Sequence, residues 1–299
     1  MKPILPMLAA LLVLAGSASA QTVDSLAGKK TIFLGDSITQ AGEYVTFTEY
    51  YLEKLYPRKN FDIYGLGLAS ETVSGLSEPG HAGGAFPRPD LSERLGRTLQ
   101  KVKPDVVFAC YGINDGIYLP LDEGRFAAFR TGISNLVSGC KAAGVADVFL
   151  ITPPIYDFTA PAGAFNYDSV MTKYAAWEMT LKIPGVHVID LHTAMRKARD
   201  ARTDVLSPDN VHPGNEGHLL MARTLLGAIG VAVPVEAAAT AEATPLYQLV
   251  KEHRRARSEL WMNHIGYTRE GRIAPQPLGS GAATVAKLQE RINALRAGQ

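Results

Sequence analysis

The chain has 299 residues, of which 46% are hydrophobic and 20% are charged, and its formal net charge is +1. This composition is that of a globular protein with a sizeable core, and the length suits one or two domains. A charge this close to neutral gives no electrostatic basis for binding nucleic acid or an anionic membrane surface, so we expect neither partner.

Residues 1–20 have the pattern of a secretory signal peptide. Lys2 gives a positively charged start, an apolar run extends from Leu8 to Leu14, and Ala18-Ser19-Ala20 matches a cleavage site. The alternative is a membrane anchor, but the apolar run is short for a membrane span. The sequence predicts a mature protein that begins near Gln21, is periplasmic or secreted, and has no membrane span.

The first apolar strand of the mature chain ends in a turn that carries a serine. Thr31 to Leu34 is β-rich, and Gly35-Asp36-Ser37 follows it before a helix-like segment. In an open α/β sheet, a residue just past the carboxyl end of a strand lies at the edge where ligands bind. A serine is a weak nucleophile by itself, so a base and an acid must come from elsewhere in the chain.

Strand and helix patterns then alternate along the chain. Strands are expected at 31–34, 61–64, 105–111, 147–152 and 186–190, and helices at 44–56, 91–102, 123–143, 165–181 and 213–229. This alternation predicts an α/β fold with a five-stranded parallel sheet and helices on both faces. Ser37, Gly67 and Asn114 each follow the carboxyl end of a strand, so we expect all three at one edge of the sheet.

A long irregular loop, rich in Gly, Pro, Ser and Glu, extends from Ser70 to Asp90. Long loops in compact domains often serve function. We regard four residues near the serine or in this region as possible substrate contacts: Asp36, Glu71, His81 and Arg88. For His81 and Arg88, the alternative is an ordinary solvated loop.

The two cysteines are expected to be free thiols, although export would permit a disulfide. Cys110 lies near the carboxyl end of its strand, whereas Cys140 lies near the end of the helix that returns to the opposite edge. A five-residue strand is roughly 16 Å long, and a disulfide needs Cα atoms within about 7 Å.

Residues 231–299 form a linker and a helical C-terminal extension, after a core domain that covers residues 21–230. Helices are expected at 245–263 and 283–295. We favour an extension that packs back onto the core. In the alternative, four of its residues reach the rim of the active site: Trp261, His264, Tyr267 and Arg269.

The segment Asp209-Asn210-Val211-His212-Pro213 supplies the acid and the base that Ser37 needs. An Asp and a His three residues apart on a turn can meet, so the carboxylate can fix the imidazole tautomer. The other ring nitrogen can then take the serine proton. Candidate donors to an oxyanion are the backbone N–H groups of Ser37 and Gly67 and the side chain of Asn114.

Four blocks in this order resemble the SGNH hydrolases, the GDSL esterase/lipase superfamily. The blocks are Gly35-Asp36-Ser37-Ile38-Thr39, Leu66-Gly67-Leu68-Ala69-Ser70-Glu71-Thr72, Gly112-Ile113-Asn114-Asp115 and Asp209-Asn210-Val211-His212-Pro213. The resemblance covers residues 30–229 and implies a three-layer, flavodoxin-like α/β/α fold. One departure is Gly65, where relatives often carry Asn, and it concerns the geometry of the loop rather than the chemistry.

The resemblance also implies the roles of the site residues. Ser37 would be the nucleophile, His212 the base and Asp209 the orienting acid, and Ser37, Gly67 and Asn114 would form the oxyanion hole. No cofactor is implied, and no residue spacing suggests a metal site.

We therefore expect an exported serine esterase that hydrolyses short-acyl, above all acetyl, esters on carbohydrates. The substrate would be a small-molecule or oligosaccharide ester. Other enzyme activities compatible with the same residues are those of a lysophospholipase, a thioesterase or an arylesterase. A non-catalytic carbohydrate-binding protein on the same fold is a further alternative, against which the intact set of Ser, Gly, Asn, Asp and His counts.

Overall fold

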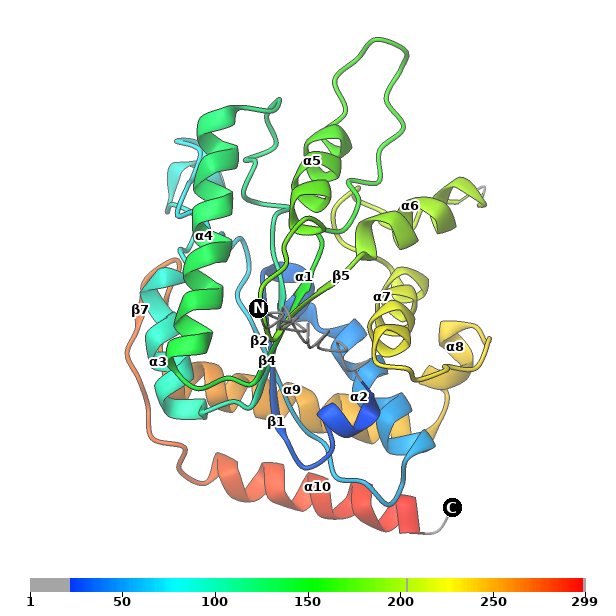
Figure 1. Ribbon diagram of the computed structural model, residues 1–299. Helices are drawn as coiled ribbons and strands as arrows, with labels where there is room; N and C mark the ends of the chain where they lie inside the picture. Colours follow the sequence, from blue (N-terminus) through cyan, green and yellow to red (C-terminus); the bar gives the residue numbers. More distant parts are fainter. Residues whose placement is uncertain (1–21, 203, 298–299) are drawn as a thin grey trace, which may run out of the picture.

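A five-stranded parallel sheet forms the centre of the computed structural model, which describes residues 22–202 and 204–297 (Figure 1). The strands are β1 (Lys30–Gly35), β2 (Asp62–Gly67), β3 (Val106–Cys110), β4 (Asp147–Ile151) and β5 (Val186–Ile189). Their order in the sheet is β2-β1-β3-β4-β5. The predicted α/β fold with a five-stranded parallel sheet is confirmed. The expected signal peptide lies outside the described residues.

Helices cover both faces of this sheet. They are α1 (Ser37–Ala41), α2 (Glu43–Leu55), α3 (Ser92–Val102), α4 (Glu123–Ala142), α5 (Asp168–Glu178), α6 (Leu191–Asp200) and α7 (Asn215–Ala228). Helices α3 and α4 pack together on one side of the sheet, and α2 and α7 pack together on the other (Figure 1). Within the described part of the chain, no helix is both long and apolar enough to span a membrane.

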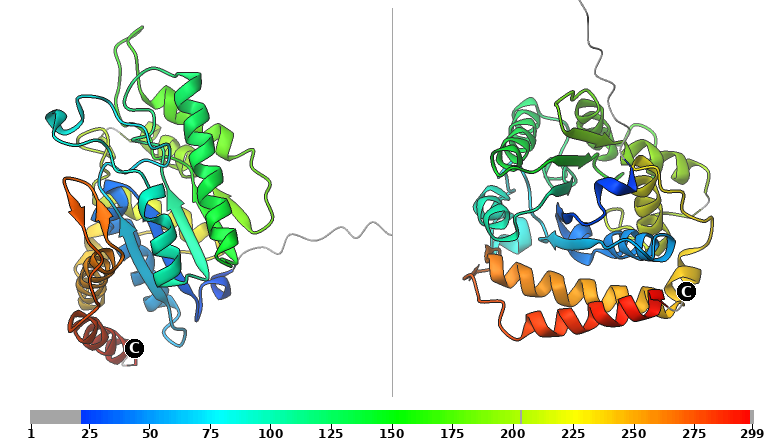
Figure 2. Two further views of the ribbon diagram at one scale, coloured as in Figure 1. Left: turned by 90° about the vertical axis from the view of Figure 1, so that its left-hand side faces the viewer. Right: turned by 60° about the horizontal axis from the view of Figure 1, so that its bottom comes forward.

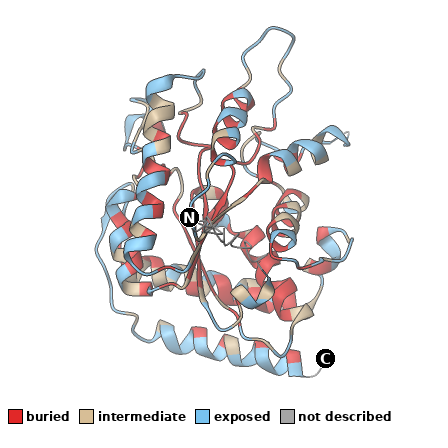
Figure 3. Cartoon of the chain, in the orientation of Figure 1, coloured by how far each residue is buried: buried red, intermediate tan, exposed pale blue. Residues whose placement is uncertain are grey.

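The interior of the sheet is held by rings that stack across neighbouring strands. Phe33, Phe108 and Phe149 occupy one register, and the ring centroids lie 4.7 and 4.4 Å apart. Strands β1 to β4 are buried along most of their length, whereas β5 is fully buried only at Ile189 (Figure 3). Burial on both faces accounts for the continuous apolar run of β3, because neither face of that strand meets water.

Both cysteines are buried and free, as predicted. Burial raises the pKa of the Cys140 thiol to about 12 and also raises the pKa of the Cys110 thiol. Both side chains therefore stay protonated at neutral pH and act as small apolar core residues.

The C-terminal extension contains α8 (Ala238–Glu242), α9 (Pro245–Ile265), a hairpin of β6 (Tyr267–Thr268) and β7 (Arg272–Ile273), and α10 (Gly281–Ala297). Helix α9 packs against β2 and α2, and α10 lies beside α9 (Figure 2). Arg257 of α9 donates a hydrogen bond to the Ile63 carbonyl of β2 at 3.0 Å. The extension thus packs onto the core, as we expected.

Two buried pairs of ionisable side chains join the extension to α2. Glu49 lies 3.3 Å from Nδ1 of His253 on α9, and Glu53 lies 2.7 Å from the guanidinium of Arg296 on α10. Both carboxylates and the imidazole are fully buried. We call these two pairs the ionic seam.

Candidate active site

Ser37, His212 and Asp209 form a continuous chain of contacts at the carboxyl edge of the sheet. Ser37 begins α1, directly after β1, and its Oγ lies 2.8 Å from Nε2 of His212. Nδ1 of the same imidazole lies 2.6 Å from Oδ2 of Asp209. The other carboxylate oxygen accepts the backbone N–H groups of Val211 and His212 at 3.0 and 2.7 Å. The three side chains expected to act together are therefore adjacent.

The acid and the base of this group are open to solvent. The side chain of Asp209 is 58% exposed and that of His212 is 48% exposed. Partial burial opposes ionisation of Asp209, but the hydrogen bonds from His212 and Val211 outweigh it and hold the carboxyl pKa below its ordinary value. A carboxylate that stays ionised at neutral pH can fix the tautomer and the orientation of the imidazole.

The turn before Ser37 depends on two neighbouring residues. A Cβ at Gly35 would lie 2.1 Å from Oγ1 of Thr39, so only glycine fits there. Asp36 is buried, and its carboxylate accepts the Ile38 N–H at 3.0 Å, which caps α1. Burial raises the pKa of Asp36 to about 7. Asp36 thus shapes the start of α1, and its burial corrects our expectation of a substrate contact.

The backbone N–H of Gly67 points away from Ser37. Gly67 pairs with Gly35, and the Gly35 carbonyl accepts its bond from the next residue, Leu68, at 2.9 Å. In a parallel ladder of this register, the N–H and C=O of Gly67 face the outer edge of β2. A Cβ at this position would lie 2.2 Å from the Gln40 nitrogen of α1, so the glycine is needed for packing.

Ser70, which the sequence did not single out, offers an N–H where Gly67 does not. Its φ is +66°, an uncommon angle for a residue with a side chain. On either side, the Ala69 N–H donates to Gln40 and the Glu71 N–H donates to the Leu68 carbonyl. The Ser70 N–H makes no hydrogen bond to any described residue. Ser70 is recognised as a candidate donor only by its left-handed backbone conformation, which a serine in the sequence does not predict.

Asn114 stands beside the turn that contains Ser70. Its Nδ2 donates to the Glu71 carbonyl at 3.3 Å, and its Oδ1 accepts from Arg88 at 2.9 Å and from Tyr118 at 3.2 Å. These bonds orient the amide so that its nitrogen faces the turn and keeps one N–H for a ligand. Asn114 is 4% exposed, so its orientation is fixed by buried neighbours.

The other expected substrate contacts hold the surrounding loops. Glu71 is fully buried and accepts two bonds of 2.6 Å from Arg94, so it cannot touch a substrate. Arg88 is buried, bonds to Asn114 and forms a two-pronged pair with Glu78. His81 is 8% exposed, and its Nδ1 is bonded to a backbone carbonyl. The structure therefore corrects these three expectations to supporting roles.

Sequence reasoning also missed Asp115, which follows Asn114 directly. Its buried carboxylate accepts N–H groups of Val73, Ser74 and Gly112 at 2.9, 2.9 and 3.0 Å. The residue thereby ties the loop after β2 to the loop after β3. Among the residues that the structure describes, no group of three His, Cys, Asp or Glu side chains could hold a metal ion.

The extension reaches this region through two of the four residues considered for it. Tyr267 lines a pocket together with Ser37, and Nε of Arg269 donates to the Ala69 carbonyl at 3.3 Å. Trp261 instead packs against the ring of Tyr64, and His264 bonds to the Gln276 carbonyl.

A family comparison identifies the chain. The model of the GDSL-like Lipase/Acylhydrolase family matches residues 33–220, which include Ser37, Ser70, Asn114 and His212. The chain therefore belongs to this family and is a carboxylic ester hydrolase, which confirms the resemblance to the SGNH hydrolases. No curated protein matches the chain significantly.

The solved structures with the same fold include the following three. A variant of a Geobacillus acetyl-xylooligosaccharide esterase superposes with a TM-score of 0.53 at 24% identity. A catalytic mutant of the acetylxylan esterase Axe2 from Geobacillus stearothermophilus gives 0.53 at 23%. LAE5, an α/β hydrolase enzyme from the metagenome of Lake Arreo, Spain, gives 0.51 at 24%. Each alignment covers 70% of this chain and 98% of the other, and at these identities each likeness confirms the fold alone.

Proposed function

We propose that this member of the GDSL-like lipase/acylhydrolase family removes acetyl or other short acyl groups from carbohydrate esters, with Ser37, His212 and Asp209 as its catalytic triad. The observation that carries the proposal is the unbroken series of contacts from Ser37 Oγ through the imidazole to the Asp209 carboxylate. Such a series is what a serine needs to become a nucleophile at neutral pH.

In the proposed reaction, Ser37 Oγ attacks the ester carbonyl while Nε2 of His212 takes its proton. The negative charge on the carbonyl oxygen is stabilised by N–H donors. The donors would be the Ser37 N–H, the free N–H of the Asn114 amide and the Ser70 N–H, which replaces Gly67 in the expected oxyanion hole. His212 then protonates the leaving alcohol, and water hydrolyses the acyl-enzyme by the reverse sequence.

Two features favour a short acyl group on a sugar. A long acyl chain needs a large apolar trough, since each buried CH₂ contributes about 0.8 kcal/mol. The loop from Ser70 to Asp90 instead consists mainly of small and polar residues. In addition, two of the solved structures with this fold are described as acetyl-xylooligosaccharide and acetylxylan esterases.

A substrate panel tests the acyl length. We expect kcat/KM to be highest for acetyl esters and to fall steeply by octanoyl across p-nitrophenyl esters of increasing length, and acetylated xylo-oligosaccharides to be hydrolysed. If octanoyl or longer esters were hydrolysed faster than acetyl esters, a lysophospholipase or lipase would become the better assignment.

Substitution of the donors tests the oxyanion hole. Asn114→Ala should lower kcat about 10²–10³-fold, because one preorganised donor is lost. A change below twofold would remove Asn114 from the hole.

The accompanying proposal of export predicts that protein recovered from the periplasm or the culture medium begins near Gln21, which N-terminal sequencing checks.

A further inference from the structure

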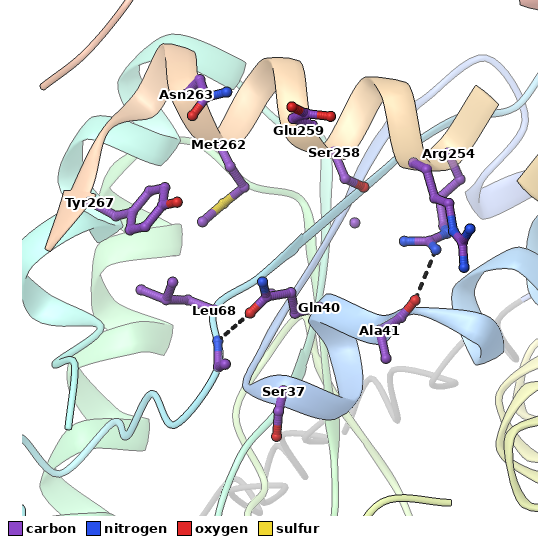
Figure 4. Close-up of a pocket in the computed structure, with 14 residues that line it drawn as sticks. Ser37, Gln40, Ala41, Leu68, Arg254, Ser258, Glu259, Met262, Asn263 and Tyr267 are labelled. Carbon is purple, nitrogen blue, oxygen red and sulfur yellow. Dashed lines mark hydrogen bonds between the residues drawn. The ribbon is translucent and has the colours of Figure 1, made fainter. Parts of the chain in front are cut away.

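A pocket of about 530 Å³ separates the catalytic edge from the C-terminal extension. One wall consists of α1 and the segment from Gly65 to Ala69, and the other consists of α9 and the start of β6 (Figure 4). Helix α9 lies beyond residues 33–220, so this wall is outside the part of the chain that the family model matches. One wall of the pocket is therefore built from residues that the family model does not match.

The pocket begins where the catalytic edge ends. Ser37 is one of the residues that line the pocket, but Figure 4 shows its hydroxyl on the side of α1 that faces away from the interior of the pocket. Between the two, the Gln40 side chain of α1 accepts the Ala69 N–H at 2.6 Å and forms a low rim. A group held in the pocket would thus lie beyond the reacting ester, on the other side of Gln40.

The floor of the pocket is the open edge of β2. The ladder with β1 turns the N–H and C=O groups of Gly65 and Gly67 outward, and within the described residues these groups have no hydrogen-bond partner. A Cβ at Gly65 would lie 3.1 Å from Ser258 Oγ, so a larger residue there would crowd the space. The absent side chains leave backbone donors and acceptors available to a ligand.

The wall that α9 contributes is polar and carries charges of both signs. Ser258 Oγ is buried and has no partner within the residues that the structure describes. Glu259, Asn263 and the ring of Tyr267 lie farther along the same wall (Figure 4). Unpaired buried polar groups are costly, so they favour a ligand that both donates and accepts hydrogen bonds.

We propose that this pocket binds the sugar units that flank the acylated unit of an oligosaccharide ester. Sugar hydroxyls donate and accept, as the β2 edge and Ser258 require, and a neutral sugar is compatible with a lining that holds two arginines and a glutamate. The volume falls within the range of small-molecule sites. This inference rests on the proposed carbohydrate esterase activity and assigns a specificity role to the extension.

The test compares a long substrate with a short one. In the double variant Glu259→Ala/Asn263→Ala, kcat/KM for an acetylated xylotetraose should fall at least about tenfold, through a higher KM. The kcat/KM for p-nitrophenyl acetate should change less than twofold, because that ester is too short to cross the Gln40 rim. Ser258→Leu, which fills the pocket instead of removing polar groups from its wall, should likewise lower kcat/KM for the long substrate and leave that for the short one almost unchanged.

Glu252→Ala provides the matched control, since Glu252 is an exposed residue two turns earlier on α9 and does not line this pocket. Equal losses on both substrates, or no loss on the long one, would overturn the subsite. If the wild-type enzyme hydrolysed p-nitrophenyl esters but not the acetylated oligosaccharide, the proposed function itself would fail. The two failures are therefore distinguishable.

Discussion

Two carboxylate–imidazole pairs in this molecule have opposite surroundings. Asp209 and His212 are more than 45% exposed, lie 2.6 Å apart, and the carboxylate receives two further backbone bonds. Glu49 and His253 are fully buried, lie 3.3 Å apart, and none of their side-chain N or O atoms has a hydrogen-bond partner among the described residues. In the proposed function the first pair moves protons, whereas the second joins two parts of the chain.

The comparison shows that burial separates the two roles. Beside Ser37, solvent exposure and short hydrogen bonds would allow the proposed proton transfer to change the charge of His212 at little cost in stability. In the ionic seam, low polarity makes each unpaired group expensive, so the pair acts on the docking of α9 against α2. Substitutions should therefore affect activity at the first pair and stability at the second.

The largest effect is expected at the exposed pair. Asp209→Asn should lower kcat about 10⁴-fold, because an amide favours the wrong imidazole tautomer. Thermal unfolding should change little, since exposed substitutions usually alter stability by at most about 0.5 kcal/mol. Kinetics with p-nitrophenyl acetate and a melting curve of the same preparation check both parts. A loss below tenfold would remove Asp209 from the triad.

At the buried pair, Glu49→Leu and His253→Leu should each lower the free energy of unfolding by about 3–5 kcal/mol, because each leaves the other group buried alone. The double variant should lose less than the sum. Urea unfolding measures all three, with Glu252→Gln on the exposed face of α9 as control. Additive losses would show that the two side chains do not interact.

Arg254 links the two regions, and its loss should have a smaller effect on catalysis. Its guanidinium donates to the Ala41 carbonyl at the end of α1 and to Thr46 of α2, both at 2.8 Å. With p-nitrophenyl acetate as the substrate, Arg254→Ala should lower kcat by roughly 10–10²-fold with little change in KM, because α1 positions Ser37. Added guanidinium should restore part of the rate, since Arg254 lines the pocket.

The control for this variant is Arg255→Ala, because Arg255 is an exposed neighbour that lies 3.5 Å from Glu43. An equal loss of kcat in the control, or a rate that guanidinium leaves unchanged, would argue against positioning by Arg254.

A further effect concerns the dependence of stability on pH. Burial, together with the charge of Glu49, raises the pKa of Glu53 from 4.5 to about 8. Between these values the folded protein holds a proton that the unfolded chain has released, so stability should fall as pH rises from about 4.5 to 8. In Glu53→Gln this decline should be shallower. Urea unfolding at pH 5 and pH 8 measures the difference, and identical slopes would contradict the shift.

Much of the fold could be predicted because its signals are local. The apolar run of β3 and the stripe of α4 are visible within a few residues, and the alternation of the two patterns implies a parallel sheet. The edge shared by Ser37 and Asn114 then follows from topology. The helix expected at 123–143 is found as Glu123–Ala142.

The missing parts depend on register and on distant contacts. The outward direction of the Gly67 N–H is decided by which residues β2 pairs with β1, and residue types do not encode that choice. Likewise, the sequence places Glu71 in a loop and so suggests an accessible carboxylate. Its burial becomes evident only from the contact with Arg94 of α3. The seam between Glu49 and His253 depends on how α9 docks, which its helical pattern alone does not specify.

The position of α9 along β2 has a consequence for solubility. β2 is an outermost strand of the sheet, and an uncovered strand edge invites pairing with strands of other molecules. Helix α9 packs against β2 and covers part of that edge, and Arg257 donates to the Ile63 carbonyl that a strand of another molecule would otherwise pair with. A chain shortened before α9 would therefore retain Ser37, His212 and Asp209, but the unpaired edge of β2 would be exposed to solvent. Such a chain should self-associate by pairing its β2 edge with strands of other molecules.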